Sequence, residues 1–304
     1  MPKITIIGSI TQDIINLPSQ RQIRSFGGIF YNLLALSFLN PQNAKIYPVC
    51  NLGDDIYQKV IWFLRKRRNI ITEGINKSKG KNNQVTLFCK KRGKRKEFLL
   101  GLVPTLDFKQ IKPYLNSDII LINFISGFDL SLETLQKTRR SNSNPIFIDI
   151  HSLALGINKD GERFPCRPKF WKEYIKCADM VQVNQEEFSI LLGKKIRNED
   201  QMRKWGKTIL ELGPKILLVT LGKNGAIVMY RENGKIRCHH SVTGSQKTVD
   251  TVGCGDVFAS AFISYYLRGR SWKSCLDFAV CVASFKSGFS GTNGMRRLSR
   301  FALR

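Results

Sequence analysis

Four short runs of almost uninterrupted apolar residues constrain the fold of this chain most strongly. They lie at 118–125, 145–150, 179–184 and 215–222, and segments with helical spacing separate them. Strands that are buried on both faces of a parallel sheet carry runs of this kind. Alternation of strands and helices implies right-handed βαβ units. The pattern therefore predicts a three-layer, doubly wound α/β domain with a mostly parallel sheet.

Two segments interrupt this alternation. Residues 10–26 and about 72–103 have the pattern of short strands and turns, and the apolar stretches beside the basic turn at 90–96 favour a hairpin. We expect these segments to form a small β lid, whose exposed edges would either pair in a homodimer or be protected by the charged turn. Another hairpin is predicted at 232–242, around an Asn-Gly pair. No repeat or linker is evident, so residues 1–304 are interpreted as one domain.

The charge of the chain is far from balanced. Lys and Arg number 49 against 23 acidic residues, which gives a net charge of +26. Such a surface attracts polyanions, so one hypothesis is that the protein binds nucleic acid or has a regulatory role. The alternative is that the charges lie on a solvated surface and reflect only a biased composition. The positive charge also favours slightly a phosphorylated or acidic small-molecule partner.

The cysteines and the apolar runs bear on the cellular environment. The eight cysteines include no C-x-x-C pair, and no apolar run reaches the length that a bilayer requires. We expect free thiols, no membrane segment and a cytoplasmic location. Cys238-His239-His240 is not expected to hold a metal, because neighbouring side chains on a strand point to opposite faces.

The segment 250–262 (DTVGCGDVFASAF) joins a glycine-rich loop to an apolar helix. Small residues allow consecutive backbone N–H groups to converge, and the N–H groups at a helix start form a site for a phosphate or an oxyanion. The carboxylate of Asp256 would repel a phosphate, but it suits a general base that removes a hydroxyl proton beside the phosphate under attack. A helix cap explains Asp256 equally well from local chemistry alone.

Five motifs, in order along the chain, resemble those of the ribokinase-like (PfkB) carbohydrate kinases. The matching segments are Gly8 with Asp13, Gly27-Gly28 with Asn32, 184–187 (N-x-x-E in the family), 219–226 (V-T-x-G-x-x-G) and 250–256 (D-T-x-G-A-G-D). The chain is identified on these motifs as a member of that family. The resemblance implies a ribokinase-like fold and an ATP-dependent transfer of a phosphoryl group to a hydroxyl of a sugar, nucleoside or related small molecule.

The resemblance assigns a role to each matching residue. Asp256 would be the base that activates the acceptor hydroxyl, and Gly253, Cys254 and Gly255 would form the anion hole. Acceptor hydroxyls would be held by Asp13, Gly27, Gly28 and Asn32; ATP by Thr220, Gly222, Gly225 and Asn184; and Mg²⁺, mostly through water, by Glu187 and Asp250 with Asn184 beside it. These roles suit phosphoryl transfer, which depends on positioning and charge stabilisation.

The chain departs from the family pattern at three positions. Phe30 stands where a small residue is usual, and Leu34 where Ser, Thr or Ala is usual, so we expect an altered acceptor cleft. Cys254 replaces the usual alanine, either as a small filler or as a thiol made reactive by the helix start. His151 and Arg163 follow a predicted strand, and either contact substrate or are an ordinary loop histidine and surface arginine.

Overall fold

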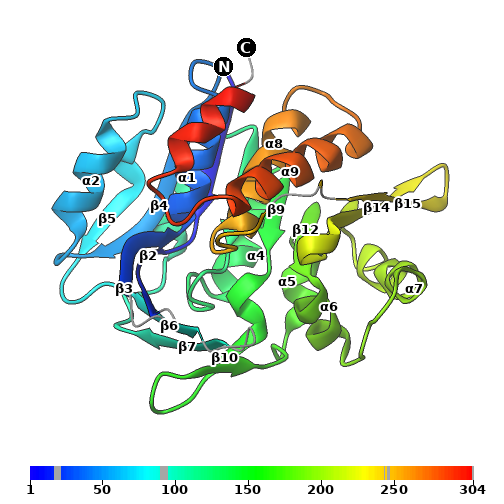
Figure 1. Cartoon of the computed structure of the whole chain (residues 1–304), viewed down its shortest axis with the longest axis horizontal. Coiled ribbons are helices and arrows are strands. Elements are labelled where there is room, and N and C mark those ends of the chain that lie inside the picture. Colours follow the sequence, from blue (N-terminus) through cyan, green and yellow to red (C-terminus); the bar gives the residue numbers. More distant parts are fainter. Residues whose placement is uncertain (17–21, 90–94, 243, 245–246, 303–304) are drawn as a thin grey trace.

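A central sheet dominates the computed structural model of the chain, which describes residues 1–16, 22–89, 95–242, 244 and 247–302 (Figure 1). In sheet order the nine strands of this described part are β15 (Lys235–Ser241), β14 (Ala226–Glu232), β13 (Ile216–Thr220), β12 (Met180–Asn184), β9 (Ile146–Asp149), β8 (Ile119–Asn123), β1 (Lys3–Ile7), β4 (Lys45–Gly53) and β5 (Ile75–Ser78). Strands β13 to β5 in this order pair in parallel, whereas β14 and β15 are antiparallel. The predicted mostly parallel sheet is confirmed.

The apolar runs account for the central strands. All five residues of β8 are buried, and so are all four of β9, because helices cover both faces of the sheet. Alternate residues of each strand belong to the two separate apolar clusters on these faces; Ile119 lies in one, and Ile120 in the other. A strand whose residues are nearly all apolar has to be buried on both faces, and these strands are.

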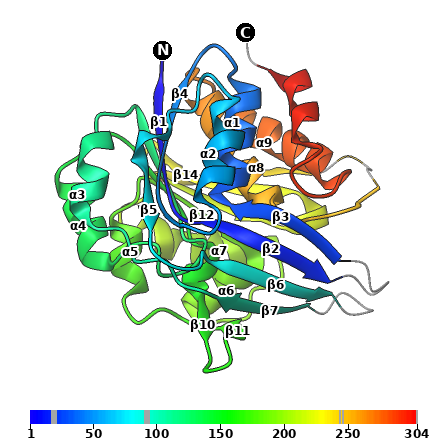
Figure 2. The same cartoon turned by 90° about the vertical axis from the view of Figure 1, so that its left-hand side faces the viewer.

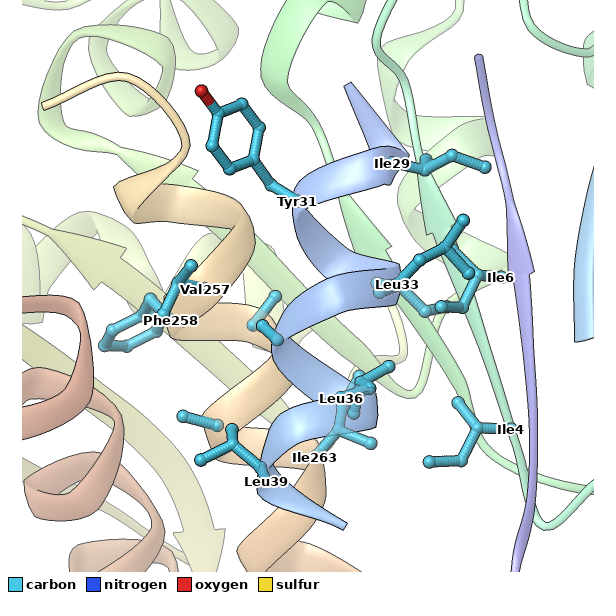
Figure 3. Close-up of a cluster of buried hydrophobic side chains, with 14 of the residues drawn as sticks. Ile4, Ile6, Ile29, Tyr31, Leu33, Leu36, Leu39, Val257, Phe258 and Ile263 are labelled. Atoms are coloured by element: carbon cyan, nitrogen blue, oxygen red, sulfur yellow. The ribbon is translucent and has the colours of Figure 1, made fainter. Parts of the chain in front are cut away.

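Helices form an outer layer on each face of the sheet. One layer contains α1 (Ile29–Leu39), α2 (Tyr57–Arg65), α8 (Cys254–Tyr266) and α9 (Trp272–Ser287), followed by the 3₁₀ helix η5 (Met295–Phe301). The other contains α3 (Phe108–Ile111), α4 (Leu132–Arg140), α5 (Trp171–Lys176), α6 (Gln185–Leu192) and α7 (Glu199–Leu210). Figure 3 shows α1 between β1 and α8, with Leu33 and Leu36 of α1 on the side of Ile4 and Ile6 of β1. None of the described helices has the combined length and apolarity needed to cross a bilayer.

Most of the two irregular segments builds a second sheet, but β5, near the start of the segment 72–103, pairs with β4 in the central sheet and is not part of the predicted lid. The strand order of the second sheet is β3 (Gln22–Gly28), β2 (Ile10–Asn16), β6 (Gln84–Cys89) and β7 (Arg95–Leu100). These strands project from the body of the molecule, below the carboxyl end of β1 (Figure 2). The basic turn predicted at 90–96 lies mostly outside the described residues. The short pair β10 (Leu155–Ile157) and β11 (Arg163–Pro165) lies beside β7, through a bridge from Phe98 to Glu162.

Two details refine the predicted boundaries. The apolar stretch at 3–10 is divided between two sheets: β1 ends at Ile7, and the chain passes through Gly8 into β2 of the lid sheet. A Cβ on Gly8 would lie 2.4 Å from the carbonyl oxygen of Asn123, so only glycine fits this close crossing. The hairpin expected around Asn233-Gly234 is present, and both residues have the positive φ that a tight turn between right-twisted strands requires.

Candidate active site

A cavity of about 360 Å³ opens where the parallel strands end at their carboxyl ends. The body contributes the last residues of β9, β12 and β13, which are Asp149, Asn184 and Thr220, while the lid sheet contributes Asp13 and Glu97 from the opposite side. The start of α8, at 251–256, closes a third side. Ligands of open α/β sheets bind at this edge, so the cavity lies where an active site is expected.

The turn before α8 depends on Gly253. This residue has φ +77, and a Cβ there would lie 2.5 Å from the ring of Tyr31 on α1. Helix α8 begins at Cys254, and its amide donates to Thr251 O at 3.2 Å. The first N–H groups of a helix lack intrahelical acceptors, and the cavity includes Gly253 and Gly255 at this helix start. An anion placed there would face the positive end of the helix.

Asp256 lies in the first turn of α8 and faces the cavity, although its side chain is almost fully buried. Its Oδ1 accepts a hydrogen bond of 2.8 Å from Asn123 Nδ2, at the end of β8. Burial raises the pKa of Asp256, while the nearby His151, the Asn123 donor and Lys286 act in the opposite direction. A carboxylate held by one amide and exposed to the cavity can accept a proton from a bound hydroxyl group.

Asp13 forms the lid side of the cavity. Thr11 Oγ1 donates to its Oδ1 at 2.7 Å, and burial, with the negative charges of Asp256 and Glu97, raises the pKa of Asp13 to about 7. The neighbouring strand β3 needs a glycine at position 27, because a Cβ on Gly27 would lie 1.9 Å from Asp13 Oδ2. Gly28 lines the cavity with φ +61.

Two more carboxyl groups line the cavity near the ends of β9 and β12. Gln182 Nε2 donates to Asp149 Oδ2 at 2.7 Å and to the carbonyl of Gly255 at 3.2 Å. Burial and the charges of Glu187 and Asp256 raise the pKa of Asp149, and burial raises the pKa of Glu187 to about 7. Glu187 also completes a capping box with Asn184, since each residue accepts a backbone N–H of the other at 2.8 Å.

Several predicted site residues lie beside the cavity rather than in its lining. Asn32 is fully buried beneath Asp256, where its Nδ2 donates to Asp256 O at 2.9 Å. Asp250 accepts hydrogen bonds from Val252 N, Ser290 Oγ and Gly291 N. The residues that the sequence predicts for the site but that do not line this cavity are Gly27, Asn32, Asp250, Cys254, Gly222 and Gly225. In the described part of the chain, no three His, Cys, Asp or Glu side chains form a metal-binding group.

His151 and Arg163 have different positions. His151 lines the cavity, has φ +34, and its Nδ1 lies 2.8 Å from Ser152 Oγ. A positive φ is uncommon outside glycine, and such residues concentrate at functional sites. Arg163 is buried, not at the surface; its guanidinium donates to the carbonyls of Ser126 and Ile125 and pairs with Glu97 of the lid at 3.3 Å. It therefore ties the lid to the body.

Four polar residues of the site were not predicted from the sequence. Asn123 and Asp149 lie near the ends of two apolar runs and are the last residues of β8 and β9, and Gln182 is a polar residue inside a third run. Carboxyl ends of parallel strands meet at one edge of the sheet, so the position of each residue in its run was a usable signal. Glu97 gave no such signal, because only the lid hairpin brings it to the cavity.

Comparison with known proteins gives consistent matches. A model of the pfkB family of carbohydrate kinases matches residues 40–296. The ATP-dependent 6-phosphofructokinase of Thermoanaerobacterium thermosaccharolyticum is 33% identical over 141 residues, which cover 46% of this chain and 39% of that protein. Fructokinase-2 of Solanum lycopersicum is 27% identical over 224 residues, which cover 71% of this chain and 65% of that protein. The chain thus spans 39% to 65% of the length of these curated relatives.

The fold has equally clear relatives. A pyrophosphate-dependent kinase of the ribokinase family, solved as a sulfate complex, superposes with a TM-score of 0.79 at 19% identity. The match covers 99% of this chain and 100% of that one. The ribokinase-like fold expected from the sequence motifs is confirmed.

Proposed function

The chain belongs to the pfkB family of carbohydrate kinases, and we propose on this premise that it transfers a phosphoryl group to a hydroxyl of a neutral sugar or polyol. The observation that carries the proposal is a single cavity that holds Asp256 at the start of α8 opposite Asp13 of the lid. One carboxyl group suits the reacting hydroxyl, and the other suits the hydroxyls that orient the acceptor.

The charge of the cavity supports a neutral acceptor. Its lining contains five carboxyl groups, from Asp13, Glu97, Asp149, Glu187 and Asp256. Among the described residues that line it, His151 is the one with a basic side chain. A phosphorylated acceptor would need cationic partners at this point, whereas carboxylates accept hydrogen bonds from sugar hydroxyls. Within the lining of this cavity the positive charge of the whole chain has no counterpart, and nothing there favours nucleic acid.

Asp256 is proposed as the general base. The acceptor oxygen attacks the terminal phosphorus of the donor, the bond from that phosphorus to the bridging oxygen breaks, and the hydroxyl proton passes to the Asp256 carboxylate. The leaving group departs with the electron pair of the broken bond. Asn123 Nδ2 fixes the carboxylate, and the backbone N–H groups of Gly253 and Gly255 are assigned to the phosphoryl oxygens.

Mg²⁺ is proposed as the metal, and the side chains near it fit a hard cation. Asp149 is buried and Glu187 half-buried, both carboxyl groups line one cavity, and the charge of Glu187 helps to raise the pKa of Asp149, so a cation beside them would be favourable. These two residues, with Asn184, would hold the ion, and it would neutralise charge on the phosphates of the donor. Asp250 was expected as a second ligand, but its oxygens already accept three hydrogen bonds from loop donors.

ATP is proposed as the donor, with Thr220 at the cavity and Gly222 and Gly225 beyond it. Pyrophosphate is the second candidate, and two observations favour it: the cavity holds only about 360 Å³, and the superposed kinase of the ribokinase family depends on pyrophosphate. Parallel assays with ATP and with pyrophosphate, on one acceptor and at equal Mg²⁺, separate the two donors. If pyrophosphate supports turnover and ATP does not, ATP is excluded as the donor.

The test of the function is phosphoryl transfer to a panel of neutral sugars, polyols, sugar phosphates and nucleosides. We expect turnover with a neutral member and a kcat lower by on the order of 1,000-fold in Asp256→Asn, because the variant cannot accept the proton. Asp160→Asn, at an exposed loop carboxylate, is the matched control and should behave as the unmodified protein does. A preference for sugar phosphates would refute the neutral acceptor, and full turnover by Asp256→Asn would refute the base.

A further inference from the structure

Lys286, near the end of α9, is completely buried, with 0% of its surface exposed. Lysine is almost never fully buried unless it is paired, because removal of an ammonium group from water is costly. The general base and the cavity described above make no direct use of this side chain. A buried cation in such a position requires a reason in the structure around it.

The surroundings of Lys286 supply partial compensation. Its Nζ donates to the carbonyl of Phe289 at 3.3 Å and lies 3.8 Å from Asp250 Oδ2. The rings of Tyr31 and Phe289 have their centroids 5.6 Å and 5.5 Å from the same nitrogen. A carboxylate, a carbonyl and two aromatic rings make a pocket for a cation, and the chain fills it with its own ammonium group.

The carboxylate beside Lys286 organises two segments at once. Asp250 accepts from Val252 N, in the turn before α8, and from Gly291 N, in the loop after α9. The backbone amide of Asp250 donates to Ser287 O at 3.0 Å, one residue after the lysine. The ion pair therefore lies where the loop after α9 crosses the turn that leads into the cavity.

Tyr31 connects the lysine to the same turn by a second route. Figure 3 shows this side chain projecting from α1 toward the turn before α8. Its ring leaves no room for a Cβ on Gly253, and the same ring lies beside the ammonium of Lys286. Lys286 thus contacts both groups that define the backbone at Gly253: the Asp250 carboxylate and the Tyr31 ring.

We propose that Lys286 is a positioning residue, a built-in cation that holds the turn 250–255 in the conformation that receives the transferring phosphoryl group. The inference rests on the proposed function for its meaning in catalysis. The Asp250 carboxylate and the Phe289 carbonyl both direct oxygen atoms at the buried position of Lys286 Nζ. Because the ammonium group of Lys286 occupies this position, no cation from solution is needed there. The positive charge also favours the ionised form of Asp256 in the first turn of α8.

Removal of the charge should disable the turn and leave the fold intact. We expect Lys286→Met, which keeps most of the volume, to lower kcat by on the order of 100-fold with a small change in the KM of the acceptor. Lys273→Met, at an exposed position of the same helix, is the matched control and should retain full activity. If Lys286→Met does not fold, the double variant Lys286→Met/Asp250→Asn, which removes both charges of the ion pair, is used in its place.

Chemical rescue distinguishes a positioning cation from a simple packing residue. Lys286→Ala leaves a space lined by the same oxygens, so methylammonium, ethylammonium or K⁺ should restore kcat by about 5-fold or more. Tetramethylammonium, which is too large and donates no hydrogen bond, should not. The unmodified protein should not respond to any of these ions. Undiminished kcat in Lys286→Met, or a loss that no cation restores in Lys286→Ala, would overturn the proposal.

A second readout separates this inference from the proposed function. If the unmodified protein phosphorylates no member of the panel, the proposed acceptor fails, but binding of pyrophosphate to the turn can still be followed by the shift in melting temperature. Stabilisation that Lys286→Met loses, and that K⁺ or ethylammonium restores in Lys286→Ala, would support the role of the lysine. Equal stabilisation of all variants, or none of the unmodified protein, would overturn it.

Discussion

Asp13 offers a direct test of how the site trades stability for function. The substitution Asp13→Asn keeps the shape of the side chain and the acceptor atom for the Thr11 hydroxyl, which donates at 2.7 Å. The close contact with Gly27 is also kept, since the side chains of aspartate and asparagine have almost equal volume. The variant therefore removes the ionisable group and little else. We expect it to be more stable than the unmodified protein above neutral pH and less active.

The magnitude follows from the pKa of Asp13. Burial raises it from 3.8 to about 7, so the folded chain holds this proton more tightly than the unfolded chain does. Stability from this group is complete below pH 3.8 and is lost as the pH rises to about 7. The full difference between the two pKa values corresponds to about 4 kcal/mol of free energy of unfolding, of which about 3 kcal/mol is lost between pH 5 and pH 8. Asparagine does not titrate, so the variant avoids this loss.

Urea unfolding at several pH values, without ligands, measures the effect. The free energy of unfolding of Asp13→Asn, relative to the unmodified protein, should grow by about 3 kcal/mol from pH 5 to pH 8. Asp54→Asn, at an exposed carboxylate, should show no such growth. The kcat/KM for the acceptor should fall on the order of 100-fold, because a charged hydrogen bond to a substrate hydroxyl is lost. A constant difference in stability across this pH range would refute the reasoning.

Two further predictions concern the groups that hold the site together. Asn123→Leu removes the donor at 2.8 Å from Asp256, so the pKa of this base should rise and the acidic limb of the kcat/KM profile should move up by about one pH unit. An unmoved limb would show that Asn123 does not set the ionisation of the base. Arg163→Lys keeps the charge but cannot satisfy both the Ser126 and Ile125 carbonyls, so urea unfolding should show a loss of about 2–3 kcal/mol. A loss below about 0.5 kcal/mol would contradict the role of Arg163 as the tie between lid and body.

Much of the body could be predicted because its signals are local. The apolar runs at 118–125 and 145–150 contain β8 and β9, and the Asn-Gly pair lies in the turn between β14 and β15. Burial on both faces leaves a strand few alternatives to a continuous apolar sequence. The order of the strands in the sheet does not follow from such runs, because it depends on pairings between distant segments.

The site could be predicted only in part, because several of its contacts join distant segments. Asn123 and Asp256 are 133 residues apart, and nothing local to either predicts their hydrogen bond. Arg163 was interpreted as a substrate contact or as a surface arginine, because neither its Glu97 partner nor its burial can be read from neighbouring residues. Lys286 gave no signal either, since a lysine in an apolar helix is usually an exposed one.

The charge of the chain illustrates why composition predicts the partner poorly. A net charge of +26 favours an anionic partner when the residues are summed without regard to position. The cavity reverses this expectation, because the parallel strands and the lid bring five carboxyl groups to one place. Exposed positive charges act through water and salt, whereas the carboxyl groups of the cavity act at short range on whatever enters it. The nature of the acceptor therefore depends on the cavity, and the surface charge can affect mainly the rate at which an anionic donor arrives.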